Sequence, residues 1–261
     1  MNFTLLIPVY NTPSKLLREC LTSVTKQFTG RDNFDCLIID DGSKDGSGKI
    51  CDEFAKKYPS IFSVIHQENH GPCYSRNLAI RKAKSDYIMF LDCDDTIENG
   101  YCDNIEYAVE KYKDSPAIHF NMFLQDISQN KTPCLVDNRI ICEEKPIRFE
   151  DRNRGTWYIW SYIFKKQFLL DHNITFPEHL TLTLETGEPV FVGEDKFFMV
   201  LLYNYTIVQG MVWFGVTHKF REDSLGKREA RNEHLKNHFK EILYKAAREE
   251  LEKRGERNIN I

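Results

Sequence analysis

The stretch YIMFLDCDDT, residues 87–96, joins an apolar run directly to three aspartates, Asp92, Asp94 and Asp95. Continuous hydrophobicity over a few residues is typical of a strand that is buried on both faces of a parallel sheet. Carboxylates this close repel one another and raise one another's pKa unless a cation compensates them. The stretch therefore predicts a buried strand that ends at a charged site, and a divalent cation is the first candidate for the compensating charge.

Strand-like and helix-like segments alternate through the first hundred residues. Four apolar runs predict strands, at 3–10, 34–40, 62–67 and 86–92. Four amphipathic segments predict helices, at 11–27, 46–59, 73–84 and 100–113. This alternation predicts an α/β fold, in which helices flank a mostly parallel sheet and the crossovers are right-handed.

Polar clusters follow three of the predicted strands. They read PVYN (8–11), IDDGS (39–43) and LDCDD (91–95). Ligands of parallel sheets bind at the carboxyl ends of the strands. We therefore expect these clusters, far apart in the sequence, to face one crevice.

The second half is less regular. Antiparallel strands are predicted at 117–127 and 134–142, and a further strand at 210–223. A strand is expected to run into a helix within 155–177, closed by His172 and Asn173, and a second helix covers 193–205. A charged helix is predicted from 226 to 254, docked through Leu235, Phe239, Ile242 and Leu243. The expected organisation is one domain, 1–225, with halves 1–100 and 101–225, and a C-terminal helical extension, 226–261.

The composition is that of a soluble globular protein, with 41% hydrophobic and 28% charged residues. A net charge of −4 argues against broad binding to nucleic acid. The 8 cysteines include no C-x-x-C pair and are interpreted as reduced, mostly buried thiols of a cytoplasmic protein. No apolar run approaches the ~20 residues that span a bilayer, and the N-terminus lacks the pattern of a signal peptide.

Each acidic cluster has a structural and a functional interpretation. In an extended segment Asp92 and Asp94 point the same way and suit Mg²⁺ or Mn²⁺, which take further ligands from a substrate's phosphates. The alternative is a solvated acidic turn that caps the next helix. Asp41 could accept a hydrogen bond from a nucleobase N–H, or belong to an ordinary turn. Glu194 and Asp195 suit a helix start by charge alone, or one of them is a general base. Neither a dinucleotide-binding glycine motif nor a P-loop is present.

The order of these motifs is more specific than any one of them. IPVYN (7–11), DDGSKDGS (40–47), NHGPCYSRNLAI (69–80), FLDCDD (90–95) and GED (193–195) follow one another. This pattern resembles the family 2 glycosyltransferases of the GT-A fold, over about residues 1–225. The resemblance implies an inverting transfer of a sugar from a nucleotide diphosphate donor, a UDP-sugar, in the synthesis of a bacterial surface polysaccharide.

The resemblance also implies roles for individual residues. Pro8, Tyr10 and Asp41 hold the base, and Asn69 and Arg76 line the donor pocket. Asp92 and Asp94 match the D-x-D pair, which holds the ribose and the Mn²⁺ or Mg²⁺ cofactor. Asp195 matches the general base that deprotonates the acceptor hydroxyl, with Glu194 beside it. His218 could approach the metal or the diphosphate, and the alternative of a core or surface histidine stays open.

The acceptor is where the sequence is least informative. Trp160 lies in the aromatic run GTWYIWSYIF (155–164), which suits either stacking on a saccharide or plain core packing. The expected acceptor is a saccharide or a lipid-linked saccharide, with membrane contact at the inner face left open. Competing classes are a sugar nucleotidyltransferase, which usually carries a glycine-rich basic loop that PVYNTPSK lacks, and a non-catalytic protein that binds sugar nucleotides.

Overall fold

The structure, a computed structural model, describes residues 1–126, 128–134, 146–147, 157–178, 182–183, 189–190, 194–206, 208–219 and 245–255. Within these ranges the first half contains β1 (Phe3–Val9), α1 (Ser14–Phe28), β2 (Phe34–Asp40), α2 (Ser47–Lys57), β3 (Phe62–His66), α3 (Pro72–Lys82), β4 (Tyr87–Phe90), β5 (Thr96–Ile97) and α4 (Tyr101–Lys111). The second half contains β6 (Ala117–Gln125), β7 (Lys131–Cys134), β8 (Pro146–Ile147), the 3₁₀ turn η2 (Ile159–Ser161), β9 (Tyr162–Lys165), α6 (Lys166–Asp171), β10 (Leu182–Thr183), β11 (Pro189–Val190), α7 (Glu194–Tyr205) and β12 (Val208–Lys219).

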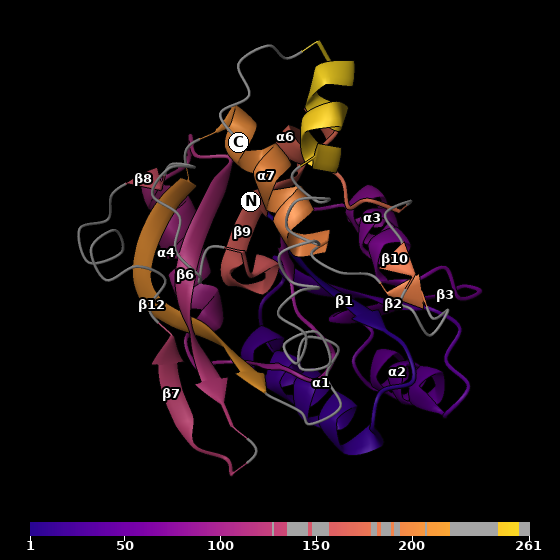
Figure 1. Cartoon of the computed structure of the whole chain (residues 1–261). Coiled ribbons are helices and arrows are strands. Elements are labelled where there is room, and N and C mark those ends of the chain that lie inside the picture. The colour runs from indigo at the N-terminus through magenta and orange to yellow at the C-terminus, as the bar shows by residue number, and fades with distance from the viewer. Residues whose placement is uncertain are drawn as a thin grey trace.

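One sheet runs through both halves, with the order β3-β2-β1-β4-β9-β6-β12-β5. Strands β3, β2, β1 and β4 are parallel neighbours, as the alternation predicts. Strand β9 is antiparallel to both β4 and β6 and joins the two halves, while the long strands β6 and β12 run parallel, side by side (Figure 1). The expected α/β fold with an antiparallel portion is confirmed.

Helices cover both faces of the parallel half. Helix α3 lies on one side of β1 and β2, and α1 and α2 lie on the other (Figure 1). Every residue of β4 is buried, so the apolar run before the aspartates is the central strand that its sequence predicts. The seven described cysteines are free thiols, and five of them are buried.

The predicted strands and helices of the second half are largely present. Strand β6 pairs antiparallel with β7, which overlaps the predicted second strand, 134–142, only at Cys134; residues 135–142 lie outside the described residues. Helix α6 ends at Asp171 with His172 as its C-cap, and Asn173 has a left-handed backbone with φ 48°, as expected for the closing residues. No helix among the described residues is long and apolar enough to cross a membrane.

A C-terminal helix is present at 245–253. Its side chains Ala247 and Leu251 are fully buried, and the Arg254 guanidinium donates to the carbonyl oxygen of His172 at 2.9 Å. The helix therefore docks near the end of α6. The docking residues predicted at 235–243 lie outside the described residues.

We predict that Leu251→Ala lowers the free energy of unfolding by about 2–5 kcal/mol, because truncating a buried leucine leaves a cavity. Thermal or urea denaturation measures this loss. The matched control is Glu252→Ala on the exposed side of the same helix, which should change stability by less than about 0.5 kcal/mol. Equal stability of the two variants would contradict the docking of this helix.

Candidate active site

The sheet opens where β1 extends beyond β4. The last bond between these strands runs from the Leu91 N–H to the Leu6 oxygen at 3.0 Å. Pro8 lies two residues further along β1 and has no N–H with which to continue the pairing. Pro8 therefore lies where the sheet parts, and the loops after β1, β2 and β4 leave from this edge as expected.

Arg76 on α3 is the centre of the charged site. Its side chain is 7% exposed and its two terminal nitrogens lie 3.1 Å from Asp92 Oδ1 and 3.2 Å from Glu194 Oε1. Asp195 Oδ1 lies 3.8 Å from the same guanidinium. Although burial opposes the charge, Asp195, Asp92 and Glu194 raise the pKa of Arg76 above its usual value. Arg76 thus joins the strand-end carboxylate to the two carboxylates that begin α7.

Packing of aromatic rings sets the distance between α3 and α7. The Arg76 guanidinium lies over the ring of Phe176, 5.4 Å from its centroid. The Phe176 ring stacks on Phe198 of α7 with centroids 4.4 Å apart. Asn77 then fixes the Phe176 backbone, donating to its oxygen at 2.9 Å and accepting from its N–H at 2.8 Å. The position of Asp195 relative to Arg76 is therefore determined by the core.

Asp195 has the properties of a candidate general base. Burial raises its pKa well above the ordinary aspartate value, the Arg76 guanidinium opposes the shift, and Glu194 and Asp92 add to it. Its Oδ1 atom is buried and has no hydrogen-bond partner among the described residues. A carboxylate of raised pKa with an unbonded oxygen can accept a proton from a substrate hydroxyl.

Asp92 and Asp94 are not held in an extended segment, so that part of the sequence prediction is wrong. The Asp95 N–H donates to the Asp92 oxygen at 3.0 Å, which makes 92–95 a turn. Asp92 and Asp94 are half-buried, and they are the carboxylates at this edge that could hold a divalent ion. Among the described residues, no group of three or more His, Cys, Asp and Glu side chains is arranged to hold a metal.

Asp95 is a buried partner that sequence reasoning did not assign. Its carboxylate lies 2.8 Å from His218 Nδ1 and accepts the Lys219 N–H at 2.8 Å. Burial lowers the pKa of His218, but the bonded Asp95 carboxylate outweighs it and raises that pKa to about 9. Protein cations therefore compensate two of the three aspartates, Arg76 for Asp92 and His218 for Asp95. An ion at His218 would have to replace the proton on Nε2.

Asp41 is buried at the end of β2 and is surrounded by donors from one loop. Its carboxylate accepts hydrogen bonds from Gln67 Nε2 at 2.6 Å, the His70 N–H at 2.9 Å and the Gly71 N–H at 2.8 Å. Asn69 donates to the Asp41 carbonyl oxygen at 3.1 Å. A carboxylate has about four acceptor positions, so one remains for a ligand. Asp41 and Asn69 lie together, as expected. Most of the hydrogen bonds that they make hold the segment between β3 and α3 in place.

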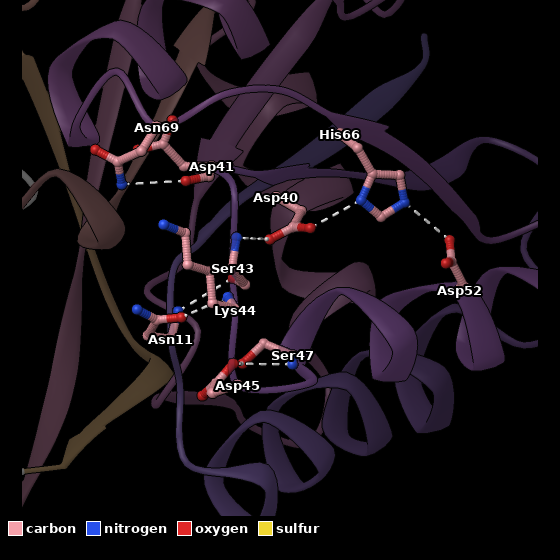
Figure 2. A network of polar contacts seen from close by, with 10 residues as sticks. All are labelled: Asn11, Asp40, Asp41, Ser43, Lys44, Asp45, Ser47, Asp52, His66 and Asn69. Carbon is pink, nitrogen blue, oxygen red and sulfur yellow. Dashed lines mark hydrogen bonds and ion pairs between the residues drawn. The ribbon is translucent and has the colours of Figure 1, made fainter.

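The loops after β1 and β2 are connected to each other. Asn11 has a left-handed backbone with φ 43°, donates its N–H to Ser43 Oγ at 3.1 Å and accepts the Lys44 N–H at 2.8 Å (Figure 2). The preceding residue, Tyr10, is 49% exposed, which is unusual for a large ring. Tyr10 thus presents an exposed aromatic ring at this edge of the sheet.

Trp160 is more buried than an open sugar platform would be. It is 7% exposed and its ring stacks on His218, with centroids 5.1 Å apart. One face of the indole is therefore covered by protein. Trp160 lies beside the Asp95–His218 pair, and the sequence interpretation as a core aromatic describes its packing better than that of a free stacking surface.

The glycosyl transferase family 2 profile matches residues 4–179, which is about two thirds of the chain. The match covers the strand ends, the Arg76 helix and the Asp92 turn described above. The chain belongs to glycosyl transferase family 2.

Two relatives with similar sequences support membership of this family. EpsH of Bacillus subtilis is 31% identical over 201 residues, covering 75% of this chain and 54% of EpsH. The poly(ribitol-phosphate) beta-glucosyltransferase of Bacillus spizizenii is 29% identical over 192 residues, covering 69% of this chain and 27% of that protein. This chain therefore spans about half or less of the length of these relatives.

The fold is similar to that of a solved glycosyltransferase structure. The crystal structure of residues 1–349 of Staphylococcus aureus TarS in complex with UDP-GlcNAc superposes with a TM-score of 0.65 and 22% identity. The superposition covers 86% of this chain and 60% of the TarS chain. The GT-A fold is thus supported by the strand order and by the structural similarity.

We predict that Arg76→Met lowers the free energy of unfolding by about 3 kcal/mol at neutral pH, because three carboxylates then lack their buried cation. The deficit should shrink near pH 4 and below, where carboxylates protonate. Urea denaturation at both pH values measures it. The control is Arg18→Met, whose pair with Glu53 is about half exposed and should contribute less than about 1 kcal/mol. A pH-independent deficit would contradict the electrostatic account.

Proposed function

We propose that this chain transfers a sugar from a nucleotide diphosphate donor, a UDP-sugar, to a hydroxyl acceptor with inversion of the anomeric carbon. The observation that carries the proposal is the Arg76 cluster at the carboxyl edge of the sheet. Asp92, proposed for the donor, and Asp195, proposed as the base, both lie against the Arg76 guanidinium. A single displacement needs such an arrangement and requires no enzyme nucleophile.

The donor half of the site is the edge formed by β1, β2 and β4. The exposed ring of Tyr10 and the buried Asp41 carboxylate suit the base, one by stacking and the other by accepting an imide N–H. Pro8 and Asn69 complete this edge, and Asp92 is positioned for the ribose. TarS, whose structure contains UDP-GlcNAc, has the same fold, which favours a uridine nucleotide.

The residues also fit a divalent cation, Mn²⁺ or Mg²⁺. Such ions keep several waters and take one or two protein carboxylates together with substrate phosphates, so a site without three protein ligands among the described residues is suitable. Asp94 is the proposed protein ligand, with His218 as a second candidate. When bound, the ion would neutralise charge that develops on the leaving diphosphate.

Deprotonation of the acceptor is assigned to Asp195. Its raised pKa makes it a stronger base than an ordinary aspartate, and the core fixes its position. Glu194 bonds the other side of Arg76 and is proposed to orient the acceptor, together with Trp160. The Arg76 guanidinium limits the rise in the pKa of Asp195 that burial causes.

The acceptor class follows from the relatives. Two similar proteins act on poly(ribitol-phosphate) by their names, so we propose a role in bacterial surface polysaccharide synthesis, with a saccharide or lipid-linked saccharide acceptor at the inner face of the membrane. Family membership makes a nucleotidyltransferase a poor alternative. The unbonded, buried Asp195 oxygen favours catalysis over binding alone.

Exchange of Asp195 for Asn should reduce sugar transfer by roughly 10²–10⁴-fold, since the acceptor proton then has no base. Donor affinity should change little. Glu194→Gln is the matched control and should be milder, because the amide still accepts from Arg76. Transfer rate and UDP affinity are measured on both variants, and near wild-type transfer by Asp195→Asn would remove the base from this position.

The metal proposal has its own test in the affinity for UDP, measured by calorimetry with Mn²⁺ and with EDTA. Wild-type protein should bind UDP more tightly with Mn²⁺. Asp94→Asn should lose that difference, while Asp114→Asn, a remote carboxylate after α4, should retain it. Equal affinity of the wild-type protein under both conditions would refute the role of the ion.

A further inference from the structure

His66, which lies outside the Arg76 cluster, connects the carboxylates of Asp40 and Asp52. His66 ends β3, directly beside Asp40 of β2 in the parallel register. Its Nδ1 lies 2.8 Å from the buried Asp40 carboxylate, and its Nε2 lies 3.0 Å from Asp52 on α2 (Figure 2). The ring therefore joins the ends of two strands to a helix.

The same Asp40 carboxylate holds the loop that follows it. Asp40 Oδ1 accepts the Ser43 N–H at 3.2 Å, and Ser43 Oγ in turn accepts the Asn11 N–H at 3.1 Å. Asn11 directly follows the exposed Tyr10 ring. A continuous path of hydrogen bonds thus runs from Asp52 through His66, Asp40 and Ser43 to the β1 loop (Figure 2).

Gly48 leaves the room that the Asp40 carboxylate needs to reach His66. A Cβ atom at Gly48 would lie 2.5 Å from Asp40 Oδ2, the oxygen that faces His66. Any side chain there would displace the carboxylate. Gly48 lies within α2, where alanine would ordinarily be the more favourable residue, so the glycine is explained by the room that Asp40 needs.

We propose that His66 is a positioning residue for the nucleotide donor, which acts through Asp40 to fix the β1 and β2 loops around the base. The inference rests on the proposed function for the place of the donor. His66 touches neither the candidate base nor the candidate metal ligands, so its effect should appear in donor affinity and not in the chemical step.

The charge of the ring decides how this contact responds to pH. Only a protonated imidazole has two N–H groups and can donate to Asp40 and Asp52 together. Hydrogen bonds that the ring donates to the Asp40 and Asp52 carboxylates raise the pKa of His66, and these carboxylates are the charged groups that cause the shift. The stabilisation is therefore complete below about pH 6.5, the usual histidine value, and is lost as pH rises through the raised pKa.

The experiment measures the affinity of the full chain for UDP-GlcNAc across this pH range, with slow hydrolysis of the same compound giving KM and kcat. UDP-GlcNAc is chosen because its diphosphate is a diester and does not titrate near neutrality. Wild-type protein should bind more weakly as pH rises. His66→Gln should bind roughly 5- to 20-fold more weakly at low pH and lose the pH dependence, with KM raised and kcat unchanged.

Two further variants separate positioning from general damage. Gly48→Ala leaves every charge in place but displaces Asp40, so it should weaken binding at all pH values. His172→Gln, at the end of α6 where the ring packs on Phe168 and Tyr205, should behave as wild type. If His66→Gln does not fold, Asp52→Asn at the exposed end of the path should still lower the pH at which affinity falls.

The outcomes are distinguishable. Failure of the wild-type protein to bind either UDP-GlcNAc or UDP would overturn the proposed function, and this inference with it. The inference alone would be overturned if the wild type binds and both His66→Gln and Gly48→Ala keep its affinity and pH dependence. Where His66→Gln does not fold, the same result in Asp52→Asn would overturn it. A fall in kcat without a change in KM would also contradict a positioning role.

Discussion

One buried guanidinium determines how the charged edge of this protein is built. Arg76 is almost fully enclosed, and a cation in such a place is stable only when carboxylates surround it. The carboxylates come from the end of β4 and the start of α7, which are about a hundred residues apart in the sequence. The ion cluster therefore fixes the start of α7 against the end of β4.

The sheet supplies the other constraint. Parallel strands end at a common edge, and antiparallel β9 joins the parallel half to β6 and β12. The Pro8 position ends the pairing of β1 with β4, so the loops that follow these strands separate at this edge of the sheet. Asp92 after β4 and Asp195 at the start of α7 then lie at one guanidinium because of strand order and because Phe198 of α7 packs on Phe176.

Much of this could be predicted from the sequence, for reasons that are local. The apolar run 87–91 is continuous because β4 is buried on both faces, and the helix at 193–205 is visible because its apolar residues follow acidic ones. The convergence of the segments that carry Tyr10, Asp41 and Asp92 on one edge follows from strand direction, whereas Arg76 on α3 is indicated by the family resemblance. The motif order that identifies the family depends on these same positions.

What could not be predicted depends on distant partners. No local pattern indicates that Asp95 pairs with His218, 123 residues later, or that 92–95 forms a turn. The role of His66 is hidden because a histidine at a strand end has no signature, and its two carboxylates lie on β2 and α2. Likewise the burial of Trp160 follows from its stacking on His218, which an aromatic run alone does not reveal.

The most direct test of the central claim is a crystal structure of this chain with UDP and Mn²⁺. The account predicts the uracil ring against Tyr10 and the Asp41 loop, the ribose at Asp92, and the metal and diphosphate at Asp94, with the Arg76 cluster intact beside them. Nucleotide bound elsewhere on the sheet, or bound here with Asp195 turned away from the diphosphate and into the core, would contradict it.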